Sequence, residues 1–254
     1  MFRHTSIGAA AFVFALVTVA GPALAQTSSR PVVRDAAAEL ACGPQVAFVA
    51  PAPALRIAGG PERGRMLFAT GETVIISGGT SQGLAPGQVY FVRRAITDRF
   101  ASPMSGGVLP ISLHTAGWVR IEDAHAEMAV ATIVQSCDSI EPGDYLEPFV
   151  LPTFAATSSA ATEPDYSAPG HVILGDERRQ IGAAGSLMVL DRGSDHGVRS
   201  GQRLTIYRET MDGRGPVARI GQATAMVVNA ETTLIRIDSS NDAVSVGDRV
   251  ALHR

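Results

Sequence analysis

The sequence predicts a mainly β protein made of two tandem small β-barrel repeats with little helix. Three observations lead to this expectation: one stretch of sequence occurs twice, each copy divides into short strand-like segments, and turn-forming residues separate those segments. Each copy is a unit of roughly 70 residues, and short strands in such a unit close most economically into a barrel, because closure removes exposed sheet edges.

The duplication is clearest around the glycine-rich turns. Gly71–Arg94 aligns without a gap with Gly185–Arg208, at an offset of 114 residues. Gly117–Leu146 aligns in the same way with Gly221–Val250, at an offset of 104 residues. The offset falls because the first copy has a longer central connection, Ala95–Ala116. The chain is therefore a tandem duplication.

Both copies keep glycine at the same turn positions. Glycine is expected where the backbone needs a positive φ or approaches another segment closely. A Gly-Asp pair also recurs just before the last strand of each copy, and its Asp is expected to accept hydrogen bonds from turn amides. These turn positions are Gly79, Gly83, Gly87, Gly143 and Asp144 in the first copy and Gly193, Gly197, Gly201, Gly247 and Asp248 in the second.

The expected strands are β-branched, aromatic or alternating, and Gly, Asn, Asp, Ser or Pro interrupts them. In the first copy they are Thr73–Ser77, Val89–Arg93, Trp118–Ile121, Ala129–Val134 and Tyr145–Phe149. In the second they are Leu187–Asp191, Leu204–Arg208, Ala218–Val228, Thr233–Asp238 and Arg249–Leu252. Helix is scarce: Arg34–Cys42 is the one good candidate, and it leads Cys42 toward Cys137.

The start of the chain has the three parts of a secretory signal peptide. A basic region with Arg3 precedes an apolar run, Ile7–Ala20, and Ala23–Ala25 supplies the small-x-small cleavage pattern. The run is shorter than the about 20 residues that a membrane span needs, and no later segment is apolar enough to span a bilayer. We expect cleavage near Ala25 and export to the periplasm or cell envelope. The expected organisation is a signal peptide at 1–25, an N-terminal segment with the short helix at 26–56, the first barrel at 57–150, a linker at 151–170 and the second barrel at 171–254.

Charge and cysteine content narrow the function classes. The chain has 21 basic and 24 acidic residues, so the loss of Arg3 with the signal peptide leaves a net charge of −4 and no general attraction to nucleic acid. An even number of cysteines in an oxidising compartment favours a disulfide between Cys42 and Cys137. Zinc would need three or four ligands, and neither cysteine has a His at ligand spacing. A cysteine nucleophile is the other alternative, although Asp138 beside Cys137 disfavours the thiolate.

Ser194–His196 brings Ser, Asp and His together, which raises the question of catalysis. The counterpart in the first copy is Thr80–Gln82, so the acid and the base are not shared between the copies while the surrounding glycines are. Adjacent residues of an extended chain also point to opposite faces, so Asp195 is poorly placed to orient His196. We interpret the stretch as a turn into a strand and expect no catalytic residue.

The remaining polar and aromatic positions give weaker signals. His114, His125, His171, His196 and His253 are single and match no metal-binding motif, so we expect no metal and no cofactor. Trp118, the one tryptophan, is expected in the core rather than in a sugar-stacking platform. The central connection Ala95–Ala116 is the main unshared feature, and such a loop serves either specificity or simple flexibility.

Several of these motifs resemble a known family. They are the G-x-x-x-G-[LV]-x-x-G-Q strings (Gly79–Gln88 and Gly193–Gln202), Tyr90–Arg94, Ala116–Arg120, and Cys137 followed by Ile140 and Gly143–Pro148. The chain is similar to exported bacterial envelope proteins whose modules resemble the small, SH3-like C-terminal barrel of the flagellar assembly protein T and modules found beside LysM domains. The resemblance covers about residues 57–150 and 185–252 and implies a non-enzymatic envelope role such as scaffolding. No LysM domain is visible, so peptidoglycan binding is not implied.

Three functions from different classes are considered. The leading one is a structural or interaction module of the envelope, with another envelope protein or a cell-wall glycan as partner. The second is a peptidoglycan- or polysaccharide-binding module, which predicts that aromatic residues line one groove, namely Tyr90, Trp118, Tyr145 and Tyr207. The third is a hydrolase, which requires His196 or His125 to meet a carboxylate and a nucleophile across the fold.

Overall fold

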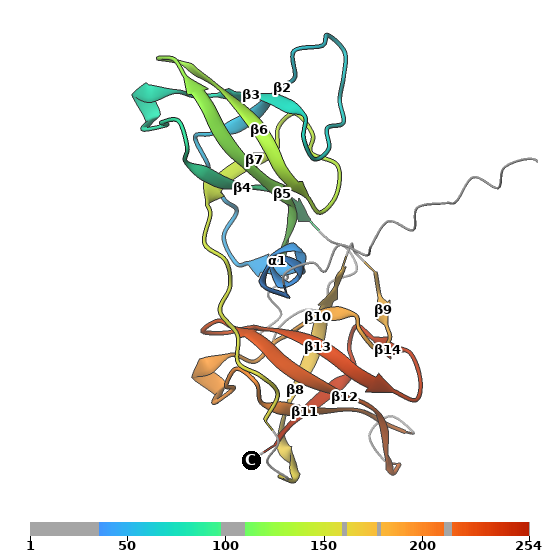
Figure 1. Ribbon diagram of the computed structural model, residues 1–254. Helices are drawn as coiled ribbons and strands as arrows, with labels where there is room; N and C mark the ends of the chain where they lie inside the picture. The colour runs from blue at the N-terminus through green and yellow to red at the C-terminus, as the bar shows by residue number, and fades with distance from the viewer. Residues whose placement is uncertain (1–35, 98–109, 159–161, 177–178, 211–214, 254) are drawn as a thin grey trace, which may run out of the picture. The chain divides into compact units, whose positions relative to one another are not determined.

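A computed structural model of the chain describes residues 36–97, 110–158, 162–176, 179–210 and 215–253 (Figure 1). The predicted fold class is confirmed: the chain is mainly β and contains two closed six-stranded antiparallel barrels with little helix. The expected signal peptide lies outside the described residues. Within the described part, no helix is long and apolar enough to cross a membrane.

The first barrel closes in the order β5-β4-β7-β2-β3-β6, with β6 pairing back onto β5. Its strands are β2 (Arg56–Gly59), β3 (Thr73–Ser77), β4 (Val89–Thr97), β5 (Ile111–Ala124), β6 (Met128–Ser136) and β7 (Tyr145–Pro148). A short strand, β1 (Gln45–Ala47), pairs with β5 beside the barrel, and it follows the helix α1 (Ala36–Cys42).

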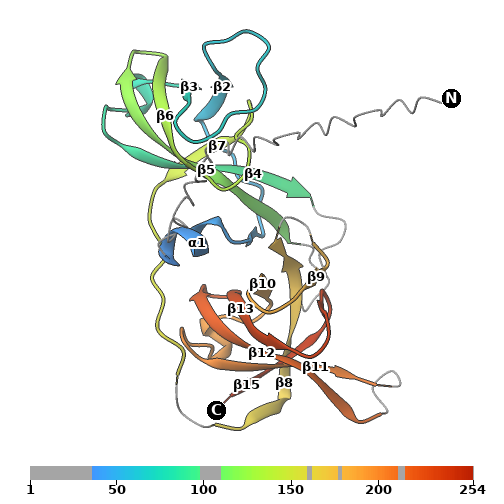
Figure 2. The same ribbon diagram turned by 45° about the vertical axis from the view of Figure 1, so that its right-hand side comes forward.

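The second barrel has the same strand order around its circumference, β12-β11-β15-β8-β10-β13 (Figure 2). Its strands are β8 (Pro164–Gly175), β10 (Leu187–Leu190), β11 (Arg203–Glu209), β12 (Val217–Val228), β13 (Thr233–Ser240) and β15 (Arg249–His253). A separate pair joins β9 (Ile181–Gly182) to β14 (Val244–Ser245). Matching strands of the two barrels thus occupy matching places, as a tandem duplication requires.

Equivalent positions also fill the two cores. Val74, Ile76, Leu84 and Val92 of the first core correspond, at the 114-residue offset, to Met188, Leu190, Val198 and Ile206 of the second. Ile121, Ala131, Ile133, Ile140 and Leu146 correspond, at the 104-residue offset, to Ala225, Ile235, Ile237, Val244 and Val250. Burial of this apolar set on the inner face of each barrel is the main source of its stability.

A bulge bends each barrel at the same point. The register between β4 and β5 shifts after Val92, which faces Gly117, and the register between β11 and β12 shifts after Ile206, which faces Gly221. A Cβ added to Gly117 would lie 2.1 Å from the carbonyl oxygen of Gln135, and the equivalent distance at Gly221 is 2.4 Å. Close approach of the neighbouring strand therefore explains glycine at both bulges.

The structure extends several predicted elements. Strand β8 was not predicted: it begins at Pro164, inside the segment 151–170 that the sequence assigns to a linker. The sequence missed it because its first half is only partly buried and its Pro, Ser and Ala residues give no alternation. Parts of the central connection are also strand: residues 95–97 end β4 and pair with residues 111–113 of β5. Residues 98–109, the middle of that connection, lie outside the described residues. Strands β1, β9 and β14 have only two or three residues and are too short for a sequence pattern to reveal, and β2 was also not predicted.

Candidate functional site

The Ser-Asp-His stretch is a single turn of 3₁₀ helix, Ser194–His196, and Thr80–Gln82 forms the same turn in the first barrel. The backbone N–H of Gly193 donates to Nδ1 of His196 at 3.3 Å. In the first barrel the N–H of Gly79 donates to Oε1 of Gln82 at 2.7 Å. The imidazole of His196 and the amide of Gln82 therefore have the same structural role, which is to accept the backbone N–H of the glycine before the turn. Among the described residues, His196 has no carboxylate partner.

The glycines that flank this turn meet strict backbone requirements. Gly83 and Gly197 end the turn with φ of 85° and 83°, in the left-handed region. A Cβ on Gly79 would lie 1.9 Å from the carbonyl oxygen of His125, and a Cβ on Gly193 would lie 2.2 Å from that of Asn229. The two turns thus pack closely against the β5–β6 hairpin in the first barrel and the β12–β13 hairpin in the second.

A second duplicated feature is an ion pair between strands. Nε and Nη2 of Arg94 donate to the two carboxylate oxygens of Asp144 at 2.7 and 2.8 Å. Arg208 and Asp248 form the same two-bond contact at 2.5 and 2.9 Å. Hydrogen bonding to the carboxylate is the largest cause raising the pKa of each arginine. We call this pair of contacts the arginine–aspartate lock.

Each lock also closes the turn before the last strand. Oδ2 of Asp144 accepts the N–H of Glu141 at 2.9 Å, and Oδ2 of Asp248 accepts the N–H of Ser245 at 2.7 Å. The sequence predicted these turn amides as partners of the aspartates but missed the arginines. The sequence did contain a signal for these pairs, because both partners recur in the second copy. Arg94 aligns with Arg208 at the 114-residue offset, and Asp144 aligns with Asp248 at the 104-residue offset.

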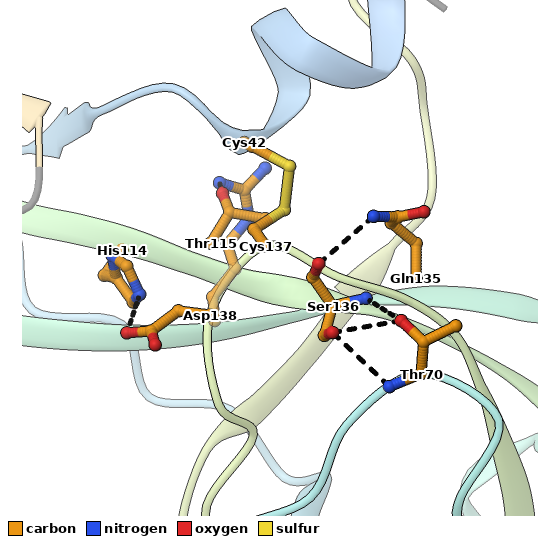
Figure 3. The surroundings of a disulfide bond; sticks show 9 residues. Cys42, Thr70, His114, Thr115, Gln135, Ser136, Cys137 and Asp138 are labelled. Carbon is orange, nitrogen blue, oxygen red and sulfur yellow. Dashed lines mark hydrogen bonds and ion pairs between the residues drawn. A yellow bond between two sulfur atoms is a disulfide. The ribbon is translucent and has the colours of Figure 1, made fainter. Parts of the chain in front are cut away.

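The predicted disulfide is confirmed and lies at the end of the helix (Figure 3). It joins Cys42 of α1 to Cys137, which follows β6, across 95 residues of sequence with a Cα–Cα distance of 5.6 Å. Beside it, Phe91, Trp118 and Phe149 pack with ring centroids 4.7 to 6.0 Å apart. The disulfide and these rings form one buried cluster that holds α1 against the first barrel.

The four aromatic residues expected along one groove do not gather in the structure. Trp118, Tyr145 and Tyr207 are buried, with exposed fractions of 7%, 3% and 1%. Tyr90 is partly buried and donates to Gln88. Tyr207 belongs to the second barrel, where it packs edge-on against Tyr166 with ring centroids 4.9 Å apart. Sequence identifies a ring but not the strand face on which it lies, so a core ring and an exposed ring look alike.

Tyr145 and Tyr207 instead each lie opposite an arginine of the neighbouring strand, and the strand that carries the tyrosine in one barrel carries the arginine in the other. Arg93 of β4 faces Tyr145 of β7, whereas in the second barrel Tyr207 of β11 faces Arg249 of β15. Nε of Arg93 lies 2.8 Å from Oε2 of Glu147, and Arg249 pairs with Glu209. Burial, helped by the nearby Glu147 carboxylate, raises the pKa of Tyr145 to about 12. Burial also raises the pKa of Tyr207 and lowers that of Arg93.

A groove of about 650 Å³ opens on the second barrel, beside the 3₁₀ turn. Its lining includes His196, Arg199, Arg203 and His253 on the barrel side and Ala156 and Ser158 on the linker side. We call it the arginine groove. None of its lining residues is aromatic apart from the two imidazoles, and both arginines are exposed.

Hydrogen bonds fix the linker wall of the arginine groove. The N–H of Ala155 donates to Oγ of Ser200 at 2.8 Å, and the N–H of Ser158 donates to the carbonyl oxygen of Gly201 at 2.7 Å. A Cβ on Gly201 would lie 2.3 Å from the carbonyl oxygen of Ala156. The groove therefore has a built wall, and glycine at 201 is needed for the linker to pack there.

The hydrogen bonds also assign roles to the two histidines. Nδ1 of His253 lies 2.9 Å from the carbonyl oxygen of Thr162, so it donates, and Nε2 lies 2.8 Å from Oγ1 of Thr205. Both ring nitrogens of His253 are thus occupied. Nδ1 of His196 accepts from Gly193, so the neutral ring carries its proton on Nε2 and offers a donor.

Other candidates from the sequence remain dispersed. His114 lies 3.2 Å from Asp138 near the disulfide (Figure 3), and His171 lies 3.3 Å from the buried Asp191 in the second barrel. His125 lies 3.4 Å from Asp123, and both are exposed. Within the described ranges, no group of three or more His, Cys, Asp or Glu side chains is arranged to hold a metal ion.

Comparison of the chain with models of protein families and with characterised proteins found no match.

Proposed function

We propose that the chain is an exported, non-catalytic module of the cell envelope, in which the two barrels bind another envelope component. One observation carries the proposal: the Ser-Asp-His stretch is a turn whose histidine replaces a glutamine of the other copy as the acceptor of a glycine N–H. A catalytic histidine needs a free nitrogen to take a proton and an acid to orient it. Nδ1 of His196 accepts the Gly193 N–H and the neutral ring carries its proton on Nε2, so the ring has no free lone pair to take a proton and, in the described part of the chain, no acid to orient it.

The pattern of divergence between the copies supports a binding role. Turn glycines, the arginine–aspartate lock and core positions are shared, whereas the surface beside the 3₁₀ turn differs. A rigid scaffold with variable surface positions is the usual arrangement in proteins that recognise partners through a repeated module.

The test is capture of the mature chain, residues 26–254, from chemically crosslinked cell envelopes, followed by a binding measurement with the purified partner. An exported protein of similar size and charge is the control. Saturable binding of one purified envelope component supports the proposal. Turnover of an ester, amide or glycosidic substrate that is lost in His196→Ala but kept in His125→Ala would contradict it and favour the hydrolase.

A polysaccharide- or peptidoglycan-binding role is the second candidate, and the arginine groove favours it. The groove has one hydrogen-bonded wall and several donors, which suits a chain of hydroxyl and acidic groups. Purified sacculi, tested beside the protein partner, separate the two candidates: sedimentation of the chain with sacculi alone supports the glycan role.

A further inference from the structure

We propose that the arginine groove of the second barrel binds a carboxylate-bearing polysaccharide. The inference rests on the proposed binding role and names the ligand class of one surface.

The groove offers donors. Arg199 and Arg203 are exposed, and in the described part of the chain neither makes an ion pair or a hydrogen bond through its guanidinium group. His196 adds the Nε2–H that its turn geometry leaves available. Guanidinium groups bind carboxylates through two parallel charge-assisted hydrogen bonds, so this set fits oxyanions.

The rest of the molecule does not attract anions. The chain has a formal net charge of −3, so an anionic ligand gains nothing from the overall charge and must be held locally. The side-chain amide of Gln202 in the lining is also engaged: its Oε1 accepts the N–H of Arg199, and its Nε2 donates to the carbonyl oxygen of His253. A ligand therefore meets donors rather than acceptors on the barrel side.

The remaining lining favours a saccharide over a peptide. A bound peptide strand pairs with an unpaired sheet edge, and the closed barrel leaves none on this face. A peptide side chain would also need an apolar pocket, but the small residues Ala156, Gly197 and Gly201 are the apolar part of the lining. A neutral sugar would need an aromatic platform, which the tyrosines and Trp118 do not provide here. Acidic sugar units need no sheet edge, apolar pocket or aromatic platform, because their carboxylates bind to the guanidinium groups.

The first barrel provides an internal reference for this assignment. Its residues at the positions of Arg199 and Arg203 are Ala85 and Val89, and Phe149 stands at the position of His253. Val89 and Phe149 belong to the cluster that packs around the disulfide. This face thus packs Val89 and Phe149 against the disulfide cluster in one copy, whereas in the other it carries exposed arginines that border a groove, which indicates a role for the second copy alone.

The test is titration of the full chain with fluorescent oligogalacturonate at low salt, using Arg199→Gln/Arg203→Gln as the variant. The control, Arg63→Gln/Arg120→Gln, removes two exposed charges from the first barrel. We expect saturable binding that the groove variant weakens about tenfold or more, because two charge-assisted contacts are lost, while the control changes it less than about twofold. The thermal transition of both variants should match that of the unchanged chain.

Three further probes make the result specific. Neutral dextran should not bind, and inorganic phosphate should compete only at far higher concentration than the oligouronate. Binding of poly-glutamate as tight as that of oligogalacturonate would overturn the saccharide assignment in favour of an acidic peptide. Equal binding by the groove and control variants would overturn the site. If an envelope component is captured but the groove variant captures it equally well, this inference fails while the proposed function stands.

Discussion

The two barrels share a backbone plan but differ on the face beside the 3₁₀ turn. In the first barrel that face carries Val89 and Phe149, packed with Phe91 and Trp118 under the disulfide-linked helix. In the second, arginines and a histidine occupy the same positions and border an open groove. The duplication therefore preserved the residues that close each barrel and changed those that meet its surroundings.

The difference has a physical basis. Turn glycines and the arginine–aspartate lock are determined by backbone conformation and buried charge, for which few residues can substitute. A surface position is held by neither constraint, so one copy can acquire an apolar cover and the other a polar groove. Substitutions in matching positions of the two copies can test this interpretation, because each barrel serves as the control of the other.

The largest expected effect is loss of the disulfide. Replacing Cys42 and Cys137 by Ser removes a link across 95 residues, which in the chain-entropy model costs about 4 kcal/mol of unfolding free energy. Trp118, the single tryptophan, lies in the same cluster and reports on the first barrel by fluorescence. We expect the denaturation midpoint of the first barrel, followed by Trp118 fluorescence, to fall strongly. The backbone amides of the second barrel should remain protected from hydrogen exchange. An equal loss of protection in both barrels would show that they unfold as one unit.

The next largest effect is expected from the lock. Asp144→Ala and Asp248→Ala each remove the buried carboxylate that makes two hydrogen bonds to the arginine and accepts one turn amide, so each should cost about 3 kcal/mol. Glu141→Gln and Asp242→Asn remove only the exposed partner of the same arginines and should cost less than about 1 kcal/mol. Chemical denaturation measures all four variants. A large cost in one copy and none in the other would show that the two locks are not equivalent.

These comparisons also show what could be predicted from the sequence. The repeat, five of the six strands in each barrel and the disulfide followed from spacing and composition, because glycine turns and paired cysteines leave a local signature; β2 and β8 were missed. The arginine groove did not. Arg199 and Arg203 lie on one surface with residues of the linker, and only the path of residues 155–158 along the barrel creates a wall.

The aromatic residues show the opposite limitation. Tyr145 and Tyr207 are prominent in the sequence and are buried, but neither belongs to the core cluster of its barrel; each lies beside an arginine of the neighbouring strand. The exchange of Arg93 and Tyr145 for Tyr207 and Arg249 preserves a contact between strands although neither residue type is kept in place. An alignment of the copies position by position cannot detect such an exchange.

An alkaline titration sharpens the comparison of these two tyrosines. The pKa of Tyr145 is raised to about 12, so the neutral phenol stabilises the fold fully below about pH 10 and this contribution is lost as the pH rises toward 12. The pKa of Tyr207 is raised in the same direction. Phenolate absorbance of both tyrosines should therefore develop at a higher pH than that of an ordinary tyrosine. Tyr145→Phe should remove the part of this high-pH absorbance change that comes from the first barrel. Between pH 10 and pH 11, the unfolding free energy of this variant should fall less than that of the unchanged chain. A component that titrates at the ordinary tyrosine pKa in the unchanged chain but is absent in this variant would contradict the burial assigned to Tyr145.

The smallest effect concerns the 3₁₀ turns, where the two copies use different side chains for one hydrogen bond. His196→Gln and Gln82→His exchange the acceptors of the Gly193 and Gly79 amides, so each should change the unfolding free energy by less than about 0.5 kcal/mol. His196→Ala and Gln82→Ala remove the acceptor and should each cost about 1 kcal/mol. Denaturation curves of the four variants measure the difference. If His196→Gln were as destabilising as His196→Ala, the imidazole would have a role that an amide cannot fill, and the equivalence of the two turns would fail.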